Sequence, residues 1–396
     1  MHPELTGAPS AWRAVAAATA IIVPLGSIYA FSVLLAPLEA LLGLTRTDLA
    51  FVFALTTVGY GAGMTLVPFA FGRAPTALLA LGCAAVSALG IAVAAAAGSR
   101  LELALGYGVL FGAGGGAAYI LCQQTVNLAV TSRHGLVNGY IVSLLPTGAM
   151  LAAPCFGWAI PAIGVRAALG WFAVFLALMG LVSAWLIRRS GVTLTVATGG
   201  VGLRDDERRR AVFWRLWLVF FLAASAGLMM LSQAAAIITA YGGTAALAVY
   251  GTTLITATIA AARLGGGWMV DRLAIPTVAS GAHALALAGS VALTFWPSPL
   301  VSVLALVLVG SGYGLVSGSS AAAIAVYWRR ALYGRMASRI YLAWCAAAIV
   351  LPIVAGRLFD LTQGYGTAVL IAAGGNVVGI VVSLGLPRQD KAPRPV

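Results

Sequence analysis

Charged residues are scarce in this chain. Asp, Glu, Lys and Arg together make up 8% of its 396 residues, whereas hydrophobic residues make up 61%. A water-soluble chain carries about a quarter charged residues and does not need so much apolar surface for its core. The scarcity of charge therefore excludes a water-soluble globular protein and indicates a polytopic membrane protein.

Histidine and cysteine are too few and too scattered for most site chemistry. The three histidines are widely separated, and no CxxC motif occurs. All four cysteines fall in apolar runs: Cys83, Cys122, Cys155 and Cys345. This pattern predicts no disulfide framework, no metal site and no cofactor. A membrane enzyme would need convergent titratable groups, and because none is visible we expect that the chain is not an enzyme.

Apolar runs long enough to cross a bilayer recur along the whole chain. Crossing ~30 Å of hydrocarbon takes about 20 helical residues. We predict spans at 14–38, 49–71, 76–98, 103–129, 136–160, 166–187, 213–239, 246–270, 277–296, 299–327, 337–358 and 367–386. An open sheet would leave backbone groups unsatisfied in lipid, so the spans are predicted to be helices. The expected fold is an all-α membrane protein with twelve transmembrane helices.

The cations are unevenly divided between the loops. With a cytoplasmic N-terminus, eighteen of the twenty-three Lys and Arg residues lie in inner segments and four in outer loops. This split follows the positive-inside rule, so we expect both termini in the cytoplasm. It accounts for the net charge of +13 without a nucleic-acid partner, and such a surface suits anionic membrane lipid. Abundant Arg, Ala and Gly favour a bacterial protein of the inner (plasma) membrane.

One long polar segment divides the chain. Residues 188–212 are predicted to form a cytoplasmic linker between two six-helix bundles, 1–187 and 213–396. Weak internal similarity supports the division, because glycine runs, GVLFGAGGGAAY and VLVGSGYGLVSG, mark spans four and ten. Such runs let helices approach closely.

The loop after span eight reads Gly267-x-x-x-Asp271-Arg272. Together with twelve helices in two parallel halves, it resembles the major facilitator superfamily, although the first copy of the signature is reduced to Gly72-Arg73. The segments GSIYAFSVLLAPL and GAGGGAAY, with an arginine in span eight, resemble the oxalate/formate antiporter and monocarboxylate transporter branch. The resemblance implies transport by alternating access, with Asp271 and Arg272 as gating residues at the cytoplasmic end of span eight.

The middle of span eight contains one charged residue, Arg263. It precedes Asp271 by eight residues, which places it about 12 Å inside the span at ~1.5 Å per residue. Transporters built from repeats bind substrate near this depth. An arginine held by backbone carbonyls or a buried acid is one alternative, but none of the ten acidic residues lies mid-span. A guanidinium matches a carboxylate in two parallel bonds, so we predict that Arg263 binds an anionic substrate. The resemblance implies the same role.

Uncharged polar residues accompany this arginine. Thr256 lies on the same side of the helix as Arg263, and Tyr119 and Gln123 form a polar stripe in span four. The resemblance implies a substrate-facing tyrosine at Tyr119, whereas for Gln123 a bond that only joins helices is the alternative. Three further residues are predicted to line the substrate cavity: Tyr29, Ser320 and Trp344.

Departures from the branch narrow the expected substrate. Ile259 occupies the position where animal monocarboxylate carriers have an aspartate, span one has no lysine, and span eleven has no cation. One central positive charge suits one negative charge, so we predict a monomeric secondary transporter of a small organic anion, foremost a monocarboxylate. A proton and a counter-anion are the alternative coupling partners. The alternative function is export of drug-like or aromatic metabolites.

Overall fold

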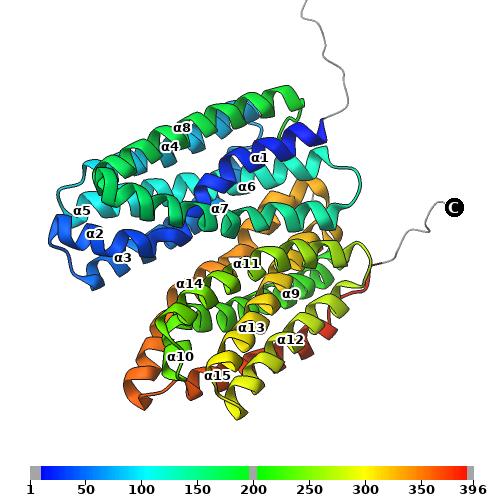
Figure 1. Ribbon diagram of the computed structural model, residues 1–396. Coiled ribbons are helices and arrows are strands. Elements are labelled where there is room, and N and C mark those ends of the chain that lie inside the picture. The colour runs from blue at the N-terminus through cyan, green and yellow to red at the C-terminus, as the bar shows by residue number, and fades with distance from the viewer. Residues whose placement is uncertain (1–9, 196–202, 390–396) are drawn as a thin grey trace, which may run out of the picture. The chain divides into compact units, whose positions relative to one another are not determined.

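The computed structural model describes residues 10–195 and 203–389, with side chains throughout except those of residues 203–209 and 360. Within these ranges every regular element is helical (Figure 1). The α-helices are α1 (Ala11–Leu25), α2 (Phe31–Leu42), α3 (Arg46–Leu66), α4 (Thr76–Ala96), α5 (Arg100–Leu103), α6 (Gly112–Ala129), α7 (His134–Ile163), α8 (Val165–Ser190), α9 (Leu203–Ser232), α10 (Ala234–Ala240), α11 (Ala245–Val270), α12 (Ile275–Phe295), α13 (Pro299–Tyr327), α14 (Tyr333–Thr362) and α15 (Gly366–Leu384). The remaining elements are the 3₁₀ turns η1 (Gly26–Ala30), η2 (Val67–Phe69) and η4 (Arg330–Leu332), and the π-helix η3 (Ala104–Phe111).

Twelve helical segments of the described ranges are long and apolar enough to cross a membrane, and each overlaps one predicted span. The predicted all-α membrane fold is therefore confirmed. Span seven differs in detail, because it was expected to continue to residue 239 and α9 ends at Ser232. The Ser232 hydroxyl donates to the Met229 carbonyl, a side-chain bond that competes with the helical backbone, and α10 starts after Gln233.

The chain divides into two compact units. Of the described residues, unit 1 contains 10–132, 144–195 and 329–345, and unit 2 contains 133–143, 203–328 and 346–389. The first part of α7 thus belongs to unit 2 and the first part of α14 to unit 1. The simpler division expected from the sequence, at the 188–212 linker, stays a prediction, and residues 196–202 of that linker lie outside the described ranges.

Both units use the same packing scheme. In unit 1, α8 packs on α1 and α4, and α6 packs on α1, α3 and α4. In unit 2, α15 packs on α9 and α12, and α13 packs on α9, α11 and α12. The helices of the two schemes correspond in chain order (Figure 1). Each scheme uses the first, second, third, fourth and sixth spans of its half of the chain: α1, α3, α4, α6 and α8 in unit 1, and α9, α11, α12, α13 and α15 in unit 2. The internal repeat suggested by the glycine runs is therefore visible in the packing.

Glycines produce the closest helix crossing of each scheme. In unit 1, a Cβ added to Gly116 of α6 would overlap the Tyr60 carbonyl of α3, and one added to Gly63 of α3 would overlap the Ala113 carbonyl. In unit 2, a Cβ added to Gly318 of α13 would overlap the Arg263 carbonyl of α11, and one added to Gly266 of α11 would overlap the Leu315 carbonyl of α13. Small residues allow this contact between backbones in lipid, where helix association depends on van der Waals packing.

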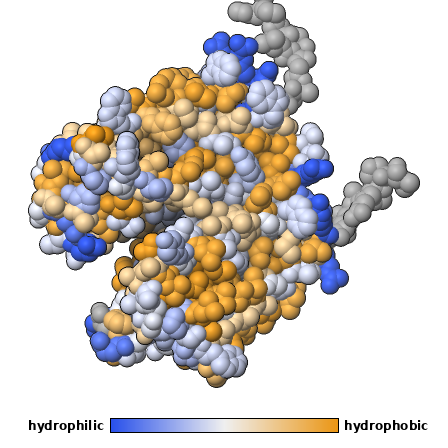
Figure 2. Space-filling model, in the orientation of Figure 1, coloured by the Kyte–Doolittle hydropathy of each residue, from blue (hydrophilic) through white to orange (hydrophobic). Residues whose placement is uncertain are grey.

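The flanks of the helices are apolar on the outside. Exposed side chains include Leu178 of α8, Leu304 of α13 and Val381 of α15, each more than half exposed. Figure 2 shows hydrophobic colour over the helix flanks and the most hydrophilic residues near helix ends. Such extended apolar surface fits lipid as the surrounding solvent.

Loops expected on the same side of the membrane meet within each unit. The Arg13 guanidinium donates to the Arg189 carbonyl, which joins the beginning of α1 to the end of α8. At the other end of the helices, Arg100 forms an ion pair with Asp48 at 2.6 Å. In unit 2 the Gln389 amide donates to the Val270 carbonyl at the end of α11. These contacts agree with the expected alternation of the spans, and a cytoplasmic location of both termini stays a prediction.

Candidate functional site

Arg263 lies inside unit 2 in the second half of α11, and only 5% of its surface is exposed. Its Nη1 donates to the Val142 carbonyl of α7 at 2.9 Å, and its Nη2 donates to the Tyr313 hydroxyl of α13 at 3.0 Å. The guanidinium carbon also lies 5.3 Å from the centre of the Tyr313 ring, a cation–π distance. Two neighbouring helices, α7 and α13, therefore orient this side chain of α11.

Glycines hold the backbone of Arg263 in this position. Its carbonyl lies against Gly318 of α13 on one side and Gly139 of α7 on another. A side chain at either glycine would push α11 away from its neighbours, so the sequence itself ensures close contact at this level. Among the Asp, Glu, Lys and Arg side chains that the structure describes, Arg263 is the only buried one.

Unit 1 contains a group of aromatic side chains, the unit 1 aromatic cluster, formed by Tyr29, Tyr60, Tyr119, Tyr341 and Trp344. The Trp344 ring meets Tyr29 edge-on at 5.9 Å and Tyr60 at 6.1 Å between ring centres. Tyr119 lies 6.0 Å from Tyr60 and 5.9 Å from Tyr341. These separations are those of favourable aromatic pairs, which stabilise the group beyond simple burial.

Several polar atoms of this region are buried without a hydrogen-bond partner among the described residues. They are the Tyr60 hydroxyl, the Trp344 indole nitrogen and the Gln123 Oε1. The Gln123 Nε2, by contrast, donates to the Tyr341 hydroxyl at 3.3 Å. A buried polar group without a hydrogen-bond partner lowers the stability of the fold by about 1–3 kcal/mol. Such groups are suited to a polar ligand that supplies the missing bonds.

The structure brings together part of the predicted site within each unit. Four predicted residues belong to unit 1 and lie in or beside its aromatic cluster: Tyr29, Tyr119, Gln123 and Trp344. In unit 2, the Thr256 hydroxyl donates to the Thr252 carbonyl of the same helix at 2.9 Å. Ser320 of α13 is buried, and its hydroxyl has no hydrogen-bond partner among the described residues.

Sequence reasoning missed Tyr60, Tyr313 and Tyr341. Tyr313 stands inside the glycine run of span ten that had been noted only for packing. Tyr60 could have been found by aligning the two repeats, because it corresponds to Arg263 across the glycine crossings. Uncharged tyrosines in apolar spans are otherwise hard to distinguish from interfacial or core residues.

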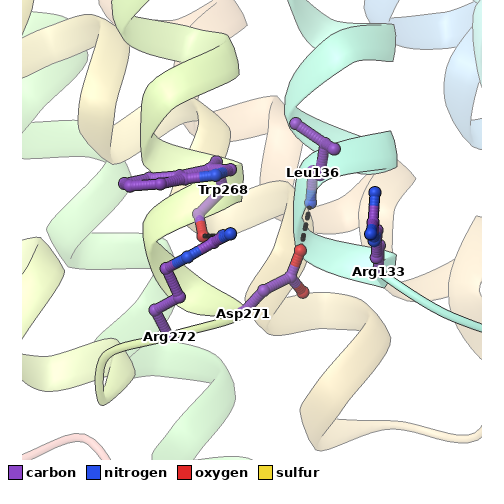
Figure 3. A pocket seen from close by; sticks show the side chains of 5 residues that line it. All are labelled: Arg133, Leu136, Trp268, Asp271 and Arg272. Carbon is purple, nitrogen blue, oxygen red and sulfur yellow. Dashed lines mark hydrogen bonds between the residues drawn. The ribbon is translucent and has the colours of Figure 1, made fainter.

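Asp271, at the end of α11, accepts two hydrogen bonds from the beginning of α7. The backbone N–H groups of Gly135 and Leu136 donate to its two carboxylate oxygens, each at 2.8 Å. The carboxylate thereby satisfies N–H groups of the first turn of α7 and complements its dipole. Arg272 follows with its guanidinium carbon 4.0 Å from the centre of the Trp268 ring (Figure 3). The two predicted gating residues thus lie where α11 and α7 meet.

Comparison with protein-family models identifies the chain. A model described as the Major Facilitator Superfamily matches residues 16–352. The chain belongs to the Major Facilitator Superfamily. A curated superfamily member of Escherichia coli (strain K12), the uncharacterized MFS-type transporter YhjX, is 22% identical over 288 residues, 72% of each chain. Family membership makes this protein a multi-pass membrane transporter, and superfamily membership supports secondary transport.

Solved superfamily structures have the same fold. The Escherichia coli fucose:proton symporter FucP superposes with a TM-score of 0.74 at 16% identity, covering 95% of this chain and 98% of FucP. The human organic anion transporter MFSD10 superposes with a TM-score of 0.72 at 16% identity, covering 95% of this chain and all of that chain (100%). A fold that serves a sugar symporter and an organic anion transporter does not identify a substrate, which depends on the site.

Proposed function

We propose that this superfamily member transports a small monocarboxylate, and that Arg263 binds its carboxylate. The burial of this guanidinium in the membrane-spanning part of α11 carries the proposal. A cation at membrane depth costs at least ~2.5–3.5 kcal/mol, so such residues mark substrate or ion pathways. Arginine keeps its charge at all physiological pH values and has a planar fork that fits a carboxylate.

The contacts of Arg263 support a binding role as well as a structural one. Val142 and Tyr313 contribute a carbonyl and a hydroxyl, both neutral, so these two bonds orient the fork without cancelling its charge. Pre-orientation lowers the entropy that the side chain would lose on binding substrate. The same two bonds are what a purely structural arginine would make, and the experiment below separates the two roles.

A monocarboxylate is favoured over a dicarboxylate because Arg263 is the only buried charge among the described side chains. A second carboxylate would need a second cation or would have to remain in water. The proposed substrate is therefore a small anion with a single negative charge. A proton and a counter-anion remain the alternative coupling partners.

The unit 1 residues Tyr29, Tyr119, Gln123 and Trp344 are proposed as further substrate-binding residues. Trp344 carries an N–H donor with no hydrogen-bond partner among the described residues, and the hydroxyl of the adjacent Tyr60 is in the same condition. Both groups can donate to a carboxylate or to a neighbouring oxygen of the substrate. We therefore add Tyr60 to the proposed set.

The aromatic cluster gives the alternative function a specific basis. Five aromatic rings in ring-to-ring contact also suit a drug-like or aromatic metabolite, which would pack by apolar area. The buried cation favours anions even then. An aromatic monocarboxylate would satisfy both features, and a panel of substrates should include one.

Asp271 and Arg272 are proposed to act in the change between open states. Asp271 bonds α11 to the first turn of α7, and breaking these bonds would release one helix end from the other. Asp271→Asn should slow turnover while leaving the substrate Kd largely unchanged. Uptake into proteoliposomes together with binding to detergent-solubilised protein measures the two separately, and an unchanged turnover would refute the gating role.

The proposal is tested by Arg263→Lys, which keeps the charge and loses the fork. We expect the Kd of a monocarboxylate, measured by substrate-induced thermal stabilisation, to rise by one to two orders of magnitude, since a charge-assisted bond contributes about 1.5–3 kcal/mol. Uptake of the labelled acid into proteoliposomes should fall with it, with and without a pH gradient.

Expression level and unliganded melting temperature distinguish binding from folding. If Arg263 is structural, Arg263→Lys should reduce the folded yield or lower the melting temperature in the absence of substrate. A well-folded variant that binds a monocarboxylate with native affinity would overturn the proposed role. Tyr119→Phe is the matched milder change, because it deletes one neutral hydroxyl and should weaken binding less.

A further inference from the structure

A cavity of about 310 Å³ opens in unit 2 where α11 ends and α7 begins (Figure 3). Its volume lies at the lower end of the range of small-molecule sites, about 300–1,000 Å³. Five residues line it: Arg133, Leu136, Trp268, Asp271 and Arg272. Two cations and one anion give this lining a net positive charge. Figure 3 shows the two arginines on either side of the Asp271 carboxylate.

The carboxylate of Asp271, the negatively charged group in the lining of this cavity, already accepts hydrogen bonds. Both oxygens of Asp271 accept backbone N–H groups of α7, from Gly135 and from Leu136. None of the ion pairs of the described residues involves Arg133, whose side chain is exposed. Arg272 is held against Trp268 by ring stacking and by a bond from its Nη1 to the Trp268 carbonyl at 3.3 Å. The lining therefore places two guanidinium groups beside a carboxylate that already accepts two hydrogen bonds.

We propose that this cavity binds the phosphate group of an anionic phospholipid, with Arg133 and Arg272 as its two cationic walls. A phosphate oxygen pair fits a guanidinium fork in the same bidentate way as a carboxylate. Phosphate is also the anion present at high density wherever a membrane helix ends, and basic residues there attract anionic lipid.

The surroundings of the cavity favour a lipid over a soluble phosphate. Trp268 stands in the last turn of a membrane-spanning helix and is 44% exposed, a position typical of the headgroup level. Leu264 lies one turn deeper on the same side of α11 and is 37% exposed. An acyl chain attached to the bound phosphate could follow this apolar flank, whereas a free phosphate would gain nothing from it.

Lipid binding to the purified transporter in a neutral detergent tests the proposal. Native mass spectrometry gives the Kd for phosphatidylglycerol and for zwitterionic phosphatidylcholine, and thermal unfolding is followed with each lipid and with inorganic phosphate. The test variant is Arg133→Gln combined with Arg272→Gln. Each cation near a membrane surface contributes about 1 kcal/mol, so phosphatidylglycerol binding should weaken about fivefold for each arginine removed.

The chain provides a matched control in Arg189→Gln. The Arg189 guanidinium carbon lies 5.6 Å from the centre of the Trp185 ring at the end of α8, with the same four-residue spacing as Trp268 and Arg272. Arg189 is not among the residues that line the cavity. Its loss removes a similar interfacial cation without touching the proposed site, and lipid-free melting temperatures check that all variants are folded.

We expect the native protein to bind phosphatidylglycerol more tightly than phosphatidylcholine. This preference should be retained in Arg189→Gln and lost in the double variant. An equal loss of this lipid preference in Arg189→Gln would show that the preference depends on general surface charge, and it would overturn the proposed site. A double variant with native preference would overturn it too. Stabilisation by inorganic phosphate equal to that by phosphatidylglycerol would assign the cavity to a soluble anion and reject the lipid.

Discussion

Tyr60 of unit 1 and Arg263 of unit 2 occupy corresponding positions of the internal repeat. The carbonyl of each lies against a glycine of the crossing helix, Gly116 of α6 for Tyr60 and Gly318 of α13 for Arg263. The backbone arrangement is therefore repeated, while the side chain at the crossing is a neutral phenol in one half and a permanent cation in the other. Packing is duplicated in this molecule, and the chemistry proposed for substrate binding is not.

The first turns of α7 and α14 show the same contrast between a charged group in unit 2 and a neutral group in unit 1. In unit 2, the first turn of α7 is capped by a carboxylate, that of Asp271. In unit 1, the first turn of α14 is capped by a neutral amide: the Gly334 N–H donates to Gln124 Oε1 at 2.6 Å, and Gln124 Nε2 donates to the Arg330 carbonyl at 2.9 Å. The missing aspartate of the first signature copy is thus replaced by a residue from a different helix, α6. A charged cap adds a charge–dipole interaction that salt screens, whereas a neutral amide cap contributes only its hydrogen bonds.

The largest expected effect comes from breaking the shared backbone crossing. Gly318→Ala and Gly116→Ala each introduce a Cβ that overlaps a carbonyl of the partner helix. Forcing atoms into a packed contact costs about 1–3 kcal/mol and more when backbones must separate. We expect both variants to lower the melting temperature in detergent by similar amounts, because the two crossings are alike.

Two other glycines provide controls for this prediction. Gly281 of α12 and Gly170 of α8 have no atom within 4 Å of an added Cβ. Alanine at these helical positions should be neutral or stabilising by up to about 1 kcal/mol. If Gly318→Ala and Gly116→Ala behave like these controls, the close crossing within each unit does not stabilise that unit.

The second effect distinguishes the two crossing side chains. Arg263→Gln should weaken binding of a monocarboxylate by one to two orders of magnitude, because it removes a charge-assisted bond of about 1.5–3 kcal/mol. Tyr60→Phe removes a neutral hydroxyl at the corresponding position and should weaken binding less than tenfold. Substrate-dependent shifts in melting temperature measure both. Equal losses would show that the repeat is functionally symmetric at this crossing.

The positions of the spans and of Arg263 could be predicted from the sequence because each depends on local physics. Bilayer thickness and hydropathy act on one helix at a time, and one charge in an apolar run is conspicuous. Tyr313 and Tyr60 could not be identified in this way, since their importance depends on which helices cross and at which glycine. Gln124 was missed as a cap for the same reason, because it lies about two hundred residues before the helix end that it satisfies. Local composition does not show which helices cross, or which distant residue caps a given helix end.

The third effect separates a charged cap from a neutral one. Asp271→Asn should lower stability by about 0.3–1 kcal/mol at low ionic strength, and the loss should shrink in high salt, where charge–dipole interactions are screened. Gln124→Ala should cost about 1 kcal/mol with little dependence on salt, because a neutral hydrogen-bonded cap is lost. Melting temperatures of both variants at low and high salt decide this. A salt-independent Asp271→Asn would indicate that the carboxylate acts through geometry alone.

The smallest effect is expected at Thr256, two turns before Arg263 on the same helix. Its hydroxyl proton is donated to the Thr252 carbonyl, so it has no second proton to donate to a carboxylate. A hydroxyl bonded to its own helix in this way remains only a potential acceptor, and a substrate carboxylate is itself an acceptor. We therefore expect Thr256→Val to change monocarboxylate affinity by less than about threefold, the effect of a small loss in bond energy. A loss of tenfold or more, with an unchanged melting temperature, would mean that Thr256 turns its hydroxyl from the helix to the substrate. In that case unit 2 would bind substrate through a polar stripe along α11 rather than through one cation, and the contrast with the neutral crossing of unit 1 would be weaker than we propose.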